Sequence, residues 1–226
     1  MDTRIGTGGA FALNPGSKAT MQLLGGRIPI LLVDGVFNEP EQLRAVALDL
    51  SYSEPGTAYP GRIAELEPND RSLQLFLGKV LQLVNEEYLP RVPPISADGQ
   101  PIKRFRNIHA DFAITDLHPD ELHPTQRKPH IDPVAMFGLV YLNPQPRGGT
   151  LFFDRATTDG GEEPSDGYFS VGDAEFRPIG RIEGVFNRLA IYPGFILHSG
   201  EIAGEWIRSD ERFVAPRLTL RLAFLP

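Results

Sequence analysis

The chain has 226 residues, 41% of them hydrophobic, and its 22 lysines and arginines against 29 aspartates and glutamates leave a formal net charge of −7. An acidic chain gains nothing from neutralising phosphate groups, so we expect no nucleic-acid partner. The longest apolar runs are too short for a membrane span, so we expect no membrane partner, and the lack of cysteine excludes disulfides, thiolate metal sites and a cysteine nucleophile.

The N-terminal part of the chain is expected to contain an arm and then helices. Residues 1–26 are small, polar and glycine-rich, which predicts a flexible arm, and residues 27–100 are expected to form a helical support. Within that support the apolar run 28–33 predicts a strand. The stronger of two predicted helices begins after Asn69 or Asp70, residue types that favour a helix N-cap. Its apolar stripe has helical spacing, predicts core packing and consists of Leu73, Phe76, Leu77, Val80, Leu81 and Val84.

Residues 101–226 have the pattern of a series of strands. Polar and apolar residues alternate over 108–115 and again over 217–224, which is typical of strands that are buried on one face. Short apolar runs at 137–142 and 150–153 are bounded by turn residues. Helices followed by strands predict an α+β, mainly β, fold, in which N-terminal helices pack on an antiparallel double-sheet barrel.

One long polar segment interrupts this series. Residues 155–184 are polar and glycine-rich, and an open loop of that length within a domain is often functional. Two interpretations remain open at this point. The segment is either a lid or substrate-facing loop, or a solvated connection between strands.

The most informative stretch is Pro129-His130-Ile131-Asp132-Pro133. In an extended strand, side chains two positions apart point to the same face, so His130 and Asp132 converge on one point. The flanking prolines favour extended structure. A neutral imidazole and a carboxylate, together with a second histidine such as His198, make a three-ligand face with open positions, which suits a non-haem Fe(II) centre.

Spacing alone does not decide the role of this triplet. His109 and Asp111 have the same spacing, and such a pair also occurs on surfaces or as a histidine tied to a nearby carboxylate. His198 is likewise compatible with a hydrogen-bonded histidine at the end of a strand. A further criterion is needed to choose between the two triplets.

From His130 to Leu225 the chain resembles the iron(II)/2-oxoglutarate-dependent oxygenases, especially their prolyl-hydroxylase-like branch. The matching pieces occur in the order found in that family: His130-Ile131-Asp132, Leu139-Val140-Tyr141-Leu142-Asn143, Gly148-Gly149-Thr150-Leu151-Phe152-Phe153, Phe186-Asn187-Arg188-Leu189, His198-Ser199-Gly200-Glu201 and Arg217-Leu218-Thr219-Leu220. The resemblance implies a double-stranded β-helix (jelly-roll) core. It also implies that His130, Asp132 and His198 are the catalytic iron ligands, because His130 precedes the Val-Tyr-Leu-Asn strand and His109 does not.

The resemblance further implies a site for 2-oxoglutarate. Fe(II) with one carboxylate ligand keeps one positive charge, and the far carboxylate of 2-oxoglutarate needs another cation. Arginine suits this role because its planar fork pairs with a carboxylate through two hydrogen bonds. Arg217 and Thr219 match the Arg-x-Ser/Thr pattern of the family, but Arg221 shares their face of the strand. The long interval between His198 and Arg217 leaves the choice between the two arginines open.

Tyrosines complete the predicted co-substrate site. Prolyl hydroxylases often place a tyrosine against the co-substrate, and Tyr141 and Tyr192 are the candidates in this chain. Either is also typical of a core residue whose hydroxyl is hydrogen-bonded.

Together these observations predict a single oxygenase-like domain over residues 1–226, with its jelly-roll core in 101–226. The predicted function is an Fe(II)- and 2-oxoglutarate-dependent dioxygenase that hydroxylates an amino acid, peptide or small metabolite. Two alternatives are a non-catalytic jelly-roll binding protein and a cupin-like metalloprotein that does not use 2-oxoglutarate. We expect a small-molecule or peptide substrate and a cytoplasmic location.

Overall fold

The fold is mainly β, with two antiparallel sheets. A computed structural model describes residues 9–57, 59–92, 100–155, 176–202 and 216–226. Among the helices described, none has both the length and the apolar character needed to cross a membrane.

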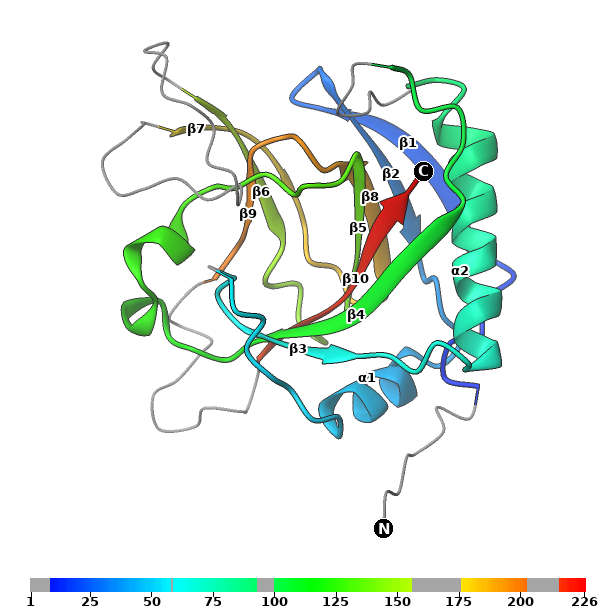
Figure 1. Cartoon of the computed structure of the whole chain (residues 1–226), viewed down its shortest axis with the longest axis horizontal. Helices are drawn as coiled ribbons and strands as arrows, with labels where there is room; N and C mark the ends of the chain where they lie inside the picture. The colour runs from blue at the N-terminus through cyan, green and yellow to red at the C-terminus, as the bar shows by residue number, and fades with distance from the viewer. Residues whose placement is uncertain (1–8, 58, 93–99, 156–175, 203–215) are drawn as a thin grey trace.

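The larger sheet contains the central strands of the C-terminal half. These are β4 (Asn107–Thr115), β5 (Met136–Tyr141), β8 (Arg188–Pro193) and β10 (Arg217–Leu225), and they lie in the order β8-β5-β10-β4. Every neighbouring pair is antiparallel. The long β10 therefore lies between β5 and β4, with hydrogen-bonded neighbours on both sides (Figure 1).

The smaller sheet faces the larger one and supplies the other wall of the barrel. It has the order β7-β6-β9, from β6 (Thr150–Arg155), β7 (Phe176–Ile182) and β9 (His198–Gly200). An isolated antiparallel bridge between His130 and His198 adds a fourth, very short member beside β9. After β4 and β5 the chain forms β6 and β7 of the smaller sheet, returns to the larger sheet in β8, and then places β9 in the smaller sheet and β10 in the larger one. This arrangement fits the predicted jelly-roll core.

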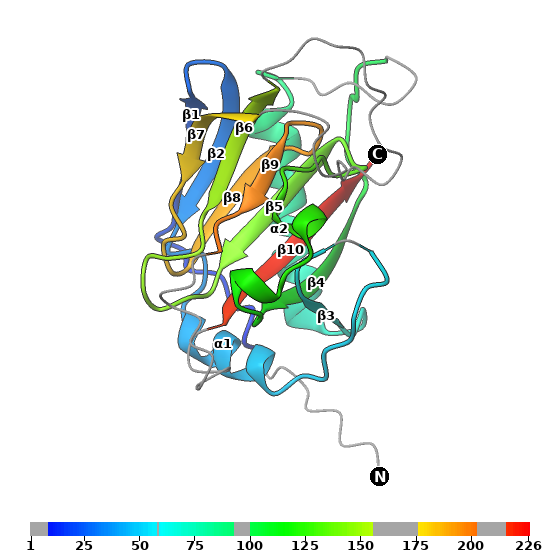
Figure 2. The ribbon, with the colours of Figure 1, turned by 90° about the vertical axis from the view of Figure 1, so that its left-hand side faces the viewer.

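N-terminal strands widen the larger sheet at both edges. β1 (Lys18–Leu24) pairs with β2 (Ile28–Asp34), β2 pairs with β8, and β3 (Arg62–Glu65) pairs with β4. Figure 2 shows β1 and β7 side by side, and the two strands are in contact. The predicted helical support at 27–100 therefore also supplies two strands of the sheet.

The expectation of a flexible arm over residues 1–26 is wrong for the part of the arm that the structure describes. Residues 18–24 form β1, and Phe11 is buried against Phe37, Phe76 and Phe112. Most side chains of β1 are exposed, so its register is held by backbone pairing with β2. Such pairing leaves no hydropathy signal in the sequence, which explains why the composition suggested an arm.

Two helices, α1 (Pro40–Leu48) and α2 (Arg71–Leu83), lie outside the barrel (Figure 1). Asp70 caps α2, since its Oδ1 accepts a 2.9 Å hydrogen bond from the Leu73 amide, as the sequence predicted. Buried residues of α2 belong to the same apolar cluster as the outward-facing side chains of β10. A short π-helical turn, Val84–Tyr88, extends α2.

Alternation along the central strands separates two interiors. In β5 and β8, Leu139, Tyr141, Ala190 and Tyr192 face the smaller sheet, whereas their neighbours face the α2 side. In β10 the apolar members Leu218, Leu220, Leu222 and Phe224 all face the α2 side. The intervening polar residues of β10 therefore point into the barrel, where the candidate site lies.

The expectation of one open loop over 155–184 is partly wrong. Phe176–Ile182 forms β7, which pairs with β6 across a bulge between Phe152 and Phe153. Its glycine and proline hid the strand pattern. The interpretation as a lid or a solvated connection now concerns only residues 156–175, which lie outside the described part of the chain. Most of the long interval between His198 and Arg217 also lies outside it, at residues 203–215.

Asn187 ties the barrel to the N-terminal layer. Its φ is +63°, and its buried side chain accepts a hydrogen bond from the Phe37 amide and donates one to the Phe37 carbonyl, both 2.9 Å long. Asparagine tolerates this backbone conformation better than most other side chains. One residue thus joins the turn before β8 to the segment between β2 and α1.

We predict that Asn187→Ala lowers the free energy of unfolding by about 2–4 kcal/mol, because it leaves two buried backbone groups unpaired. Asn187→Gly should lower the free energy of unfolding less than Asn187→Ala does, because glycine adopts the positive φ without strain. Urea unfolding followed by circular dichroism measures both. Asn69→Ala, at an exposed position before α2, should stay within about 0.5 kcal/mol of the parent. An equally small effect at Asn187 would contradict this role.

Candidate functional site

Backbone hydrogen bonds bring the predicted ligands together. The His130 amide donates to the His198 carbonyl at 2.8 Å, and the His198 amide donates to the His130 carbonyl at 2.9 Å. The Asp132 amide donates to the Gly194 carbonyl, also at 2.8 Å. Two residues along an extended chain share a face, so Asp132 lies on the same side as His130. The sheet therefore fixes all three side chains around one point.

The ligand atoms of His130, Asp132 and His198 all lie within 4.8 Å of one another. Nδ1 of His198 lies 2.7 Å from the Ile196 carbonyl oxygen. Because a carbonyl oxygen can only accept a hydrogen bond, Nδ1 carries the proton. In the neutral ring this leaves the lone pair of Nε2 free to bind a metal. Nε2 lies 3.1 Å from Oδ2 of Asp132, yet this buried oxygen has no hydrogen-bond partner. Two unused lone pairs so close together suit a shared cation.

Electrostatics keep His130 and Asp132 in the protonation states that ligation requires. Burial and the neighbouring His198 lower the pKa of His130 to about 3, so its imidazole is neutral at pH 7. Burial raises the pKa of Asp132, but His198 and His130 lower it more, and the net pKa is below its usual value. A carboxylate and two neutral imidazoles are the donor set of a facial Fe(II) site.

An inner cavity of about 60 Å³ opens beside these ligands. Among the described residues, four buried side-chain atoms have no hydrogen-bond partner: Tyr59 Oη, Asp132 Oδ2, Tyr192 Oη and Thr219 Oγ1. All four residues line the inner cavity. Buried polar groups are normally paired, so a cluster of unused ones indicates that a polar ligand completes the cavity.

Arg217 lies in a slot between two glycines. Its Nε donates to the Gly148 carbonyl at 2.8 Å and one terminal nitrogen donates to the Gly149 carbonyl at 3.3 Å. A Cβ at Gly148, whose φ is +67°, would lie 2.9 Å from Cγ of Arg217, and one at Gly200 would lie 3.2 Å from Cζ. The glycines allow a buried guanidinium whose other terminal nitrogen has no acceptor among the described residues.

Arg221 is placed differently, although it shares a strand face with Arg217. Its guanidinium makes two hydrogen bonds with the Asp111 carboxylate, at 2.6 and 2.8 Å, and lies 4.9 Å from the centre of the Tyr59 ring. Burial lowers the pKa of Arg221, but Asp111 and Tyr59 raise it more. Asp111 is thus occupied by an ion pair, and exposed His109 lies 3.6 Å from it. We therefore assign the second His-x-Asp triplet, His109 and Asp111, a structural role and not a role in metal binding.

The two candidate tyrosines also differ. Tyr141 is buried in the core between the sheets, and its hydroxyl lies 2.7 Å from that of Thr150. Thr150, and not Tyr141, lines the inner cavity. Tyr192 does line it, and burial raises the pKa of its hydroxyl well above the usual value, so the group remains a donor.

Sequence reasoning missed Tyr59 and Thr150 and gave Asp111 no part in the site. Thr150 stands in a quoted motif, Gly148-Gly149-Thr150, so alternation along β6 was a usable signal. Tyr59 stands in a loop rich in proline and glycine, where no periodicity marks it. Asp111 was compared with Asp132 only as a possible ligand.

A family model matches residues 15–224 of the chain. The chain belongs to this family, a family of unknown function (DUF6445). A search of curated proteins finds no match. Membership of DUF6445 therefore brings no established reaction with it.

Several solved structures are similar to this DUF6445 chain. A prolyl-4-hydroxylase from Pseudomonas putida has 14% identity and a TM-score of 0.41, over 87% of this chain and 86% of that one. The non-heme alpha ketoglutarate dependent epimerase SnoN from nogalamycin biosynthesis has 16% identity and a TM-score of 0.45, and the match covers 87% of this chain and 78% of SnoN. HygX from Streptomyces hygroscopicus, with nickel and 2-oxoglutarate bound, has 16% identity and a TM-score of 0.43, and the match covers 87% of this chain and 82% of HygX.

The first of these is the kind of protein that the sequence resemblance named. With TM-scores below 0.5, however, the similarities assign no role to any residue of this chain. The site is instead characterised by its own geometry: three convergent ligands, an inner cavity with unpaired polar atoms and a buried arginine.

We predict that Asp111→Asn lowers the free energy of unfolding by about 2–4 kcal/mol, because it removes the charge that neutralises the mostly buried Arg221. Chemical denaturation measures the change. The matched control is Glu87→Gln, which breaks the exposed Arg91–Glu87 pair and should cost no more than about 0.5 kcal/mol. Equal effects of the two substitutions would show that Arg221 does not depend on Asp111.

Proposed function

We propose that this protein is an Fe(II)- and 2-oxoglutarate-dependent dioxygenase that hydroxylates an amino acid, peptide or small metabolite. The observation that carries the proposal is the convergence of His130, Asp132 and His198 beside a cavity that also contains Arg217. The expectations of a cytoplasmic location and of one domain over residues 1–226 rest on the sequence alone.

The donor set supports iron as the metal. His130, Asp132 and His198 would hold Fe(II) through two neutral imidazoles and one carboxylate, which leaves other coordination positions open. The unpaired Oδ2 of Asp132 and the free Nε2 of His198 support ligation by these atoms. When bound, iron and 2-oxoglutarate would activate O2, which would oxidise 2-oxoglutarate to succinate and CO2 and would also oxidise the substrate.

Charge balance supports Arg217 as the anchor of the far carboxylate. Fe(II) with one carboxylate ligand carries one net positive charge, and 2-oxoglutarate carries two negative charges, so one further cation is required. Arg217 is buried and lines the inner cavity, and one of its terminal nitrogens has no acceptor among the described residues. Arg221, in contrast, is paired with Asp111. Thr219 and Tyr192 would add hydroxyl donors to the same ligand.

The remaining work of the chain is positioning and exclusion of water. Phe137, Leu139 and Phe152 lie next to the ligands and give the barrel an apolar wall. In such surroundings the ion pair between Arg217 and a carboxylate is screened less than it is in water. The wall also fixes the orientation of the His198 ring, which contacts Phe152 and Tyr192 at ring-centre distances of 6.1 and 5.1 Å.

The direct test is an anaerobic titration with Fe(II) and then 2-oxoglutarate, followed through the visible charge-transfer band of the iron–keto-acid chelate. The parent should give a band that saturates. Asp132→Ala should lose the band and weaken metal binding by more than about 100-fold, because it removes a ligand outright.

His109→Ala is the matched control, since His109 belongs to the triplet with the same spacing, and it should keep both the band and the metal. Circular dichroism should show that both variants are folded. Metal binding without a band would favour the cupin-like alternative, and no metal binding would favour a binding protein without catalysis.

Arg217→Gln should weaken 2-oxoglutarate binding about 10- to 100-fold without changing metal affinity, because it removes a charge-assisted pair from the inner cavity. Gly148→Ala should also weaken 2-oxoglutarate binding, because the Cβ of the new alanine would displace Arg217. Titration of the band measures both variants. Arg188→Gln affects an arginine that pairs with Asp34 and does not line the inner cavity, so it should match the parent. A larger loss in Arg221→Gln than in Arg217→Gln would reverse the assignment.

A further inference from the structure

Tyr59 lies where the inner cavity meets a larger cleft. This outer cleft of about 350 Å³ is lined by Glu54, Pro55, Gly56, Thr57, Tyr59, Gly61, Arg62, Asp116, Leu117 and Gln126. Tyr59 lines both spaces. The inner cavity, of about 60 Å³, is far smaller than typical ligand pockets, whereas the outer cleft falls within their range. A further cavity beside His130, of about 120 Å³, is also smaller than that range, so we place most of the substrate in the outer cleft.

The position of Tyr59 is fixed from two sides. Its carbonyl oxygen accepts a hydrogen bond of 3.2 Å from Nε2 of Gln126, and its ring is covered by the guanidinium of Arg221. Arg221 is in turn held by two hydrogen bonds to buried Asp111. Gly61 allows the loop to pack directly on β4, since a Cβ there would lie 2.2 Å from the Ile114 carbonyl oxygen.

The hydroxyl of this well-held residue is unused. Oη of Tyr59 is buried and has no hydrogen-bond partner. A buried hydroxyl without a partner is unfavourable, and a rigid ring that carries one is prepared to bind a polar ligand group. The ion pair of Arg221 and Asp111 thus acts as a support for Tyr59.

Tyr59 packs against a different arginine of β10 from the one proposed to anchor the co-substrate. Tyr59 packs on Arg221, and Arg221 and Arg217 are four residues apart on β10, which separates their Cα atoms by roughly 13 Å. The far carboxylate of the co-substrate belongs at Arg217. The hydroxyl of Tyr59 is therefore available to the substrate.

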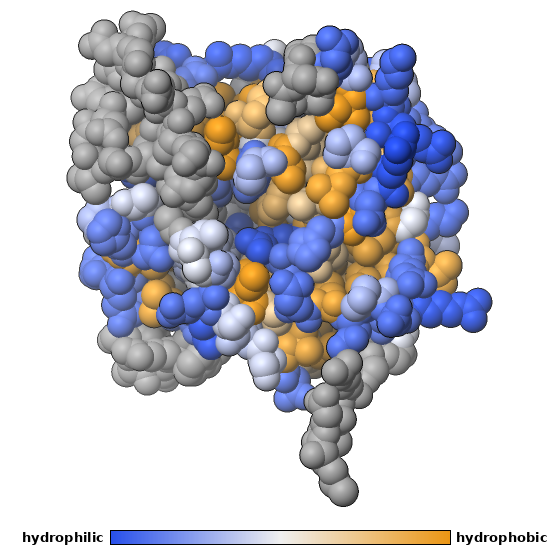
Figure 3. Space-filling view, in the orientation of Figure 1, coloured by the Kyte–Doolittle hydropathy of each residue, from blue (hydrophilic) through white to orange (hydrophobic). Residues whose placement is uncertain are grey.

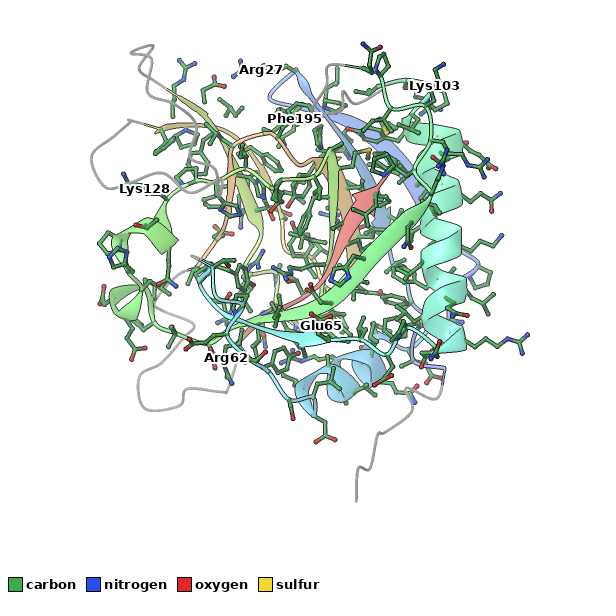
Figure 4. The ribbon with its side chains drawn as sticks, in the orientation of Figure 1. Arg27, Arg62, Glu65, Lys103, Lys128 and Phe195 are labelled. Carbon is green, nitrogen blue, oxygen red and sulfur yellow. The ribbon has the colours of Figure 1, made fainter. Side chains whose placement is uncertain are left out.

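The outer cleft contains charges of both signs. Arg62 forms an ion pair with Asp116, and Glu54 adds a second carboxylate. Figure 4 shows Arg62 at the beginning of β3, and Figure 3 shows hydrophilic side chains, together with some hydrophobic ones, around a recess on this face. The Arg62 side chain is 36% exposed, and its ion pair with Asp116 occupies only one of its two terminal nitrogens. A ligand carboxylate can pair with Arg62 while a ligand ammonium pairs with Asp116 or Glu54.

We propose that Tyr59 positions the substrate through its hydroxyl, and that the substrate is a small zwitterion of the free amino acid kind, held in the outer cleft by Arg62 and Asp116. This inference rests on the proposed function of the metal site. It narrows the substrate from an amino acid, peptide or small metabolite to a molecule that carries both an ammonium and a carboxylate.

The test uses the full chain loaded with Ni(II) and 2-oxoglutarate, a combination chosen so that binding is measured without turnover. Each of the twenty standard L-amino acids is titrated by calorimetry. We expect at least one to bind. Its amide, which lacks the carboxylate, and its N-acetyl derivative, which lacks the ammonium, should each bind at least about tenfold more weakly.

Tyr59→Phe keeps the ring over Arg221 and removes only the hydroxyl, so it should weaken binding of that amino acid about tenfold and leave 2-oxoglutarate affinity unchanged. Tyr52→Phe is the matched control. The hydroxyl of Tyr52 donates to the Ala47 carbonyl at 2.9 Å, and Tyr52 lines neither the inner cavity nor the outer cleft. Its amino acid affinity should equal that of the parent.

Three results would overturn the inference. If no amino acid binds to protein that forms the iron and 2-oxoglutarate complex, the substrate class is wrong while the proposed function stands. If Tyr59→Phe binds the amino acid as tightly as the parent, the role of Tyr59 is wrong. If the complex with iron and 2-oxoglutarate does not form, the proposed function fails and the inference fails with it.

Discussion

The antiparallel bridge between His130 and His198 is the contact on which the candidate site depends. Its two hydrogen bonds, 2.8 and 2.9 Å long, join segments that are far apart in the sequence and set both imidazoles on one side of the smaller sheet. The alternation of an extended chain then brings Asp132 to the same side. Because backbone pairing sets the spacing, the ligands are held in place before any metal binds. Pre-organisation of this kind lowers the cost of ordering a site when its ligand arrives.

Strand β10 supplies the second requirement, a polar lining inside an otherwise apolar barrel. One of its faces packs against the α2 side, and the other carries Arg217, Thr219 and Arg221 into the interior. Such groups are unfavourable unless they are paired. Asp111 pairs with Arg221, and two backbone carbonyls partly satisfy Arg217. Thr219 keeps an unpaired hydroxyl. The barrel therefore pairs one arginine internally and leaves donors for a ligand around the other.

Much of this arrangement follows from local sequence signals, and the rest depends on distant contacts. The cap at Asp70 and the alternation along β10 were readable because each is set by neighbours in the chain. β1 was missed because backbone pairing leaves no hydropathy pattern. The Arg-x-Ser/Thr pattern favoured Arg217, but the choice stayed open because Arg221 shares its strand face. Asp111, on another strand, separates the two arginines. Tyr59 had no signal at all, since a single loop tyrosine becomes informative only when its hydroxyl is found unpaired in a cavity.

The central claim is that one metal and one dicarboxylate share the inner cavity. The most direct measurement is a crystal structure of the protein loaded with Fe(II) and 2-oxoglutarate under anaerobic conditions. The account predicts iron held by His130, Asp132 and His198, with the far carboxylate of 2-oxoglutarate paired with Arg217 and hydrogen-bonded to Thr219. Iron on His109 and Asp111, or the dicarboxylate on Arg221 with its pair to Asp111 broken, would contradict it.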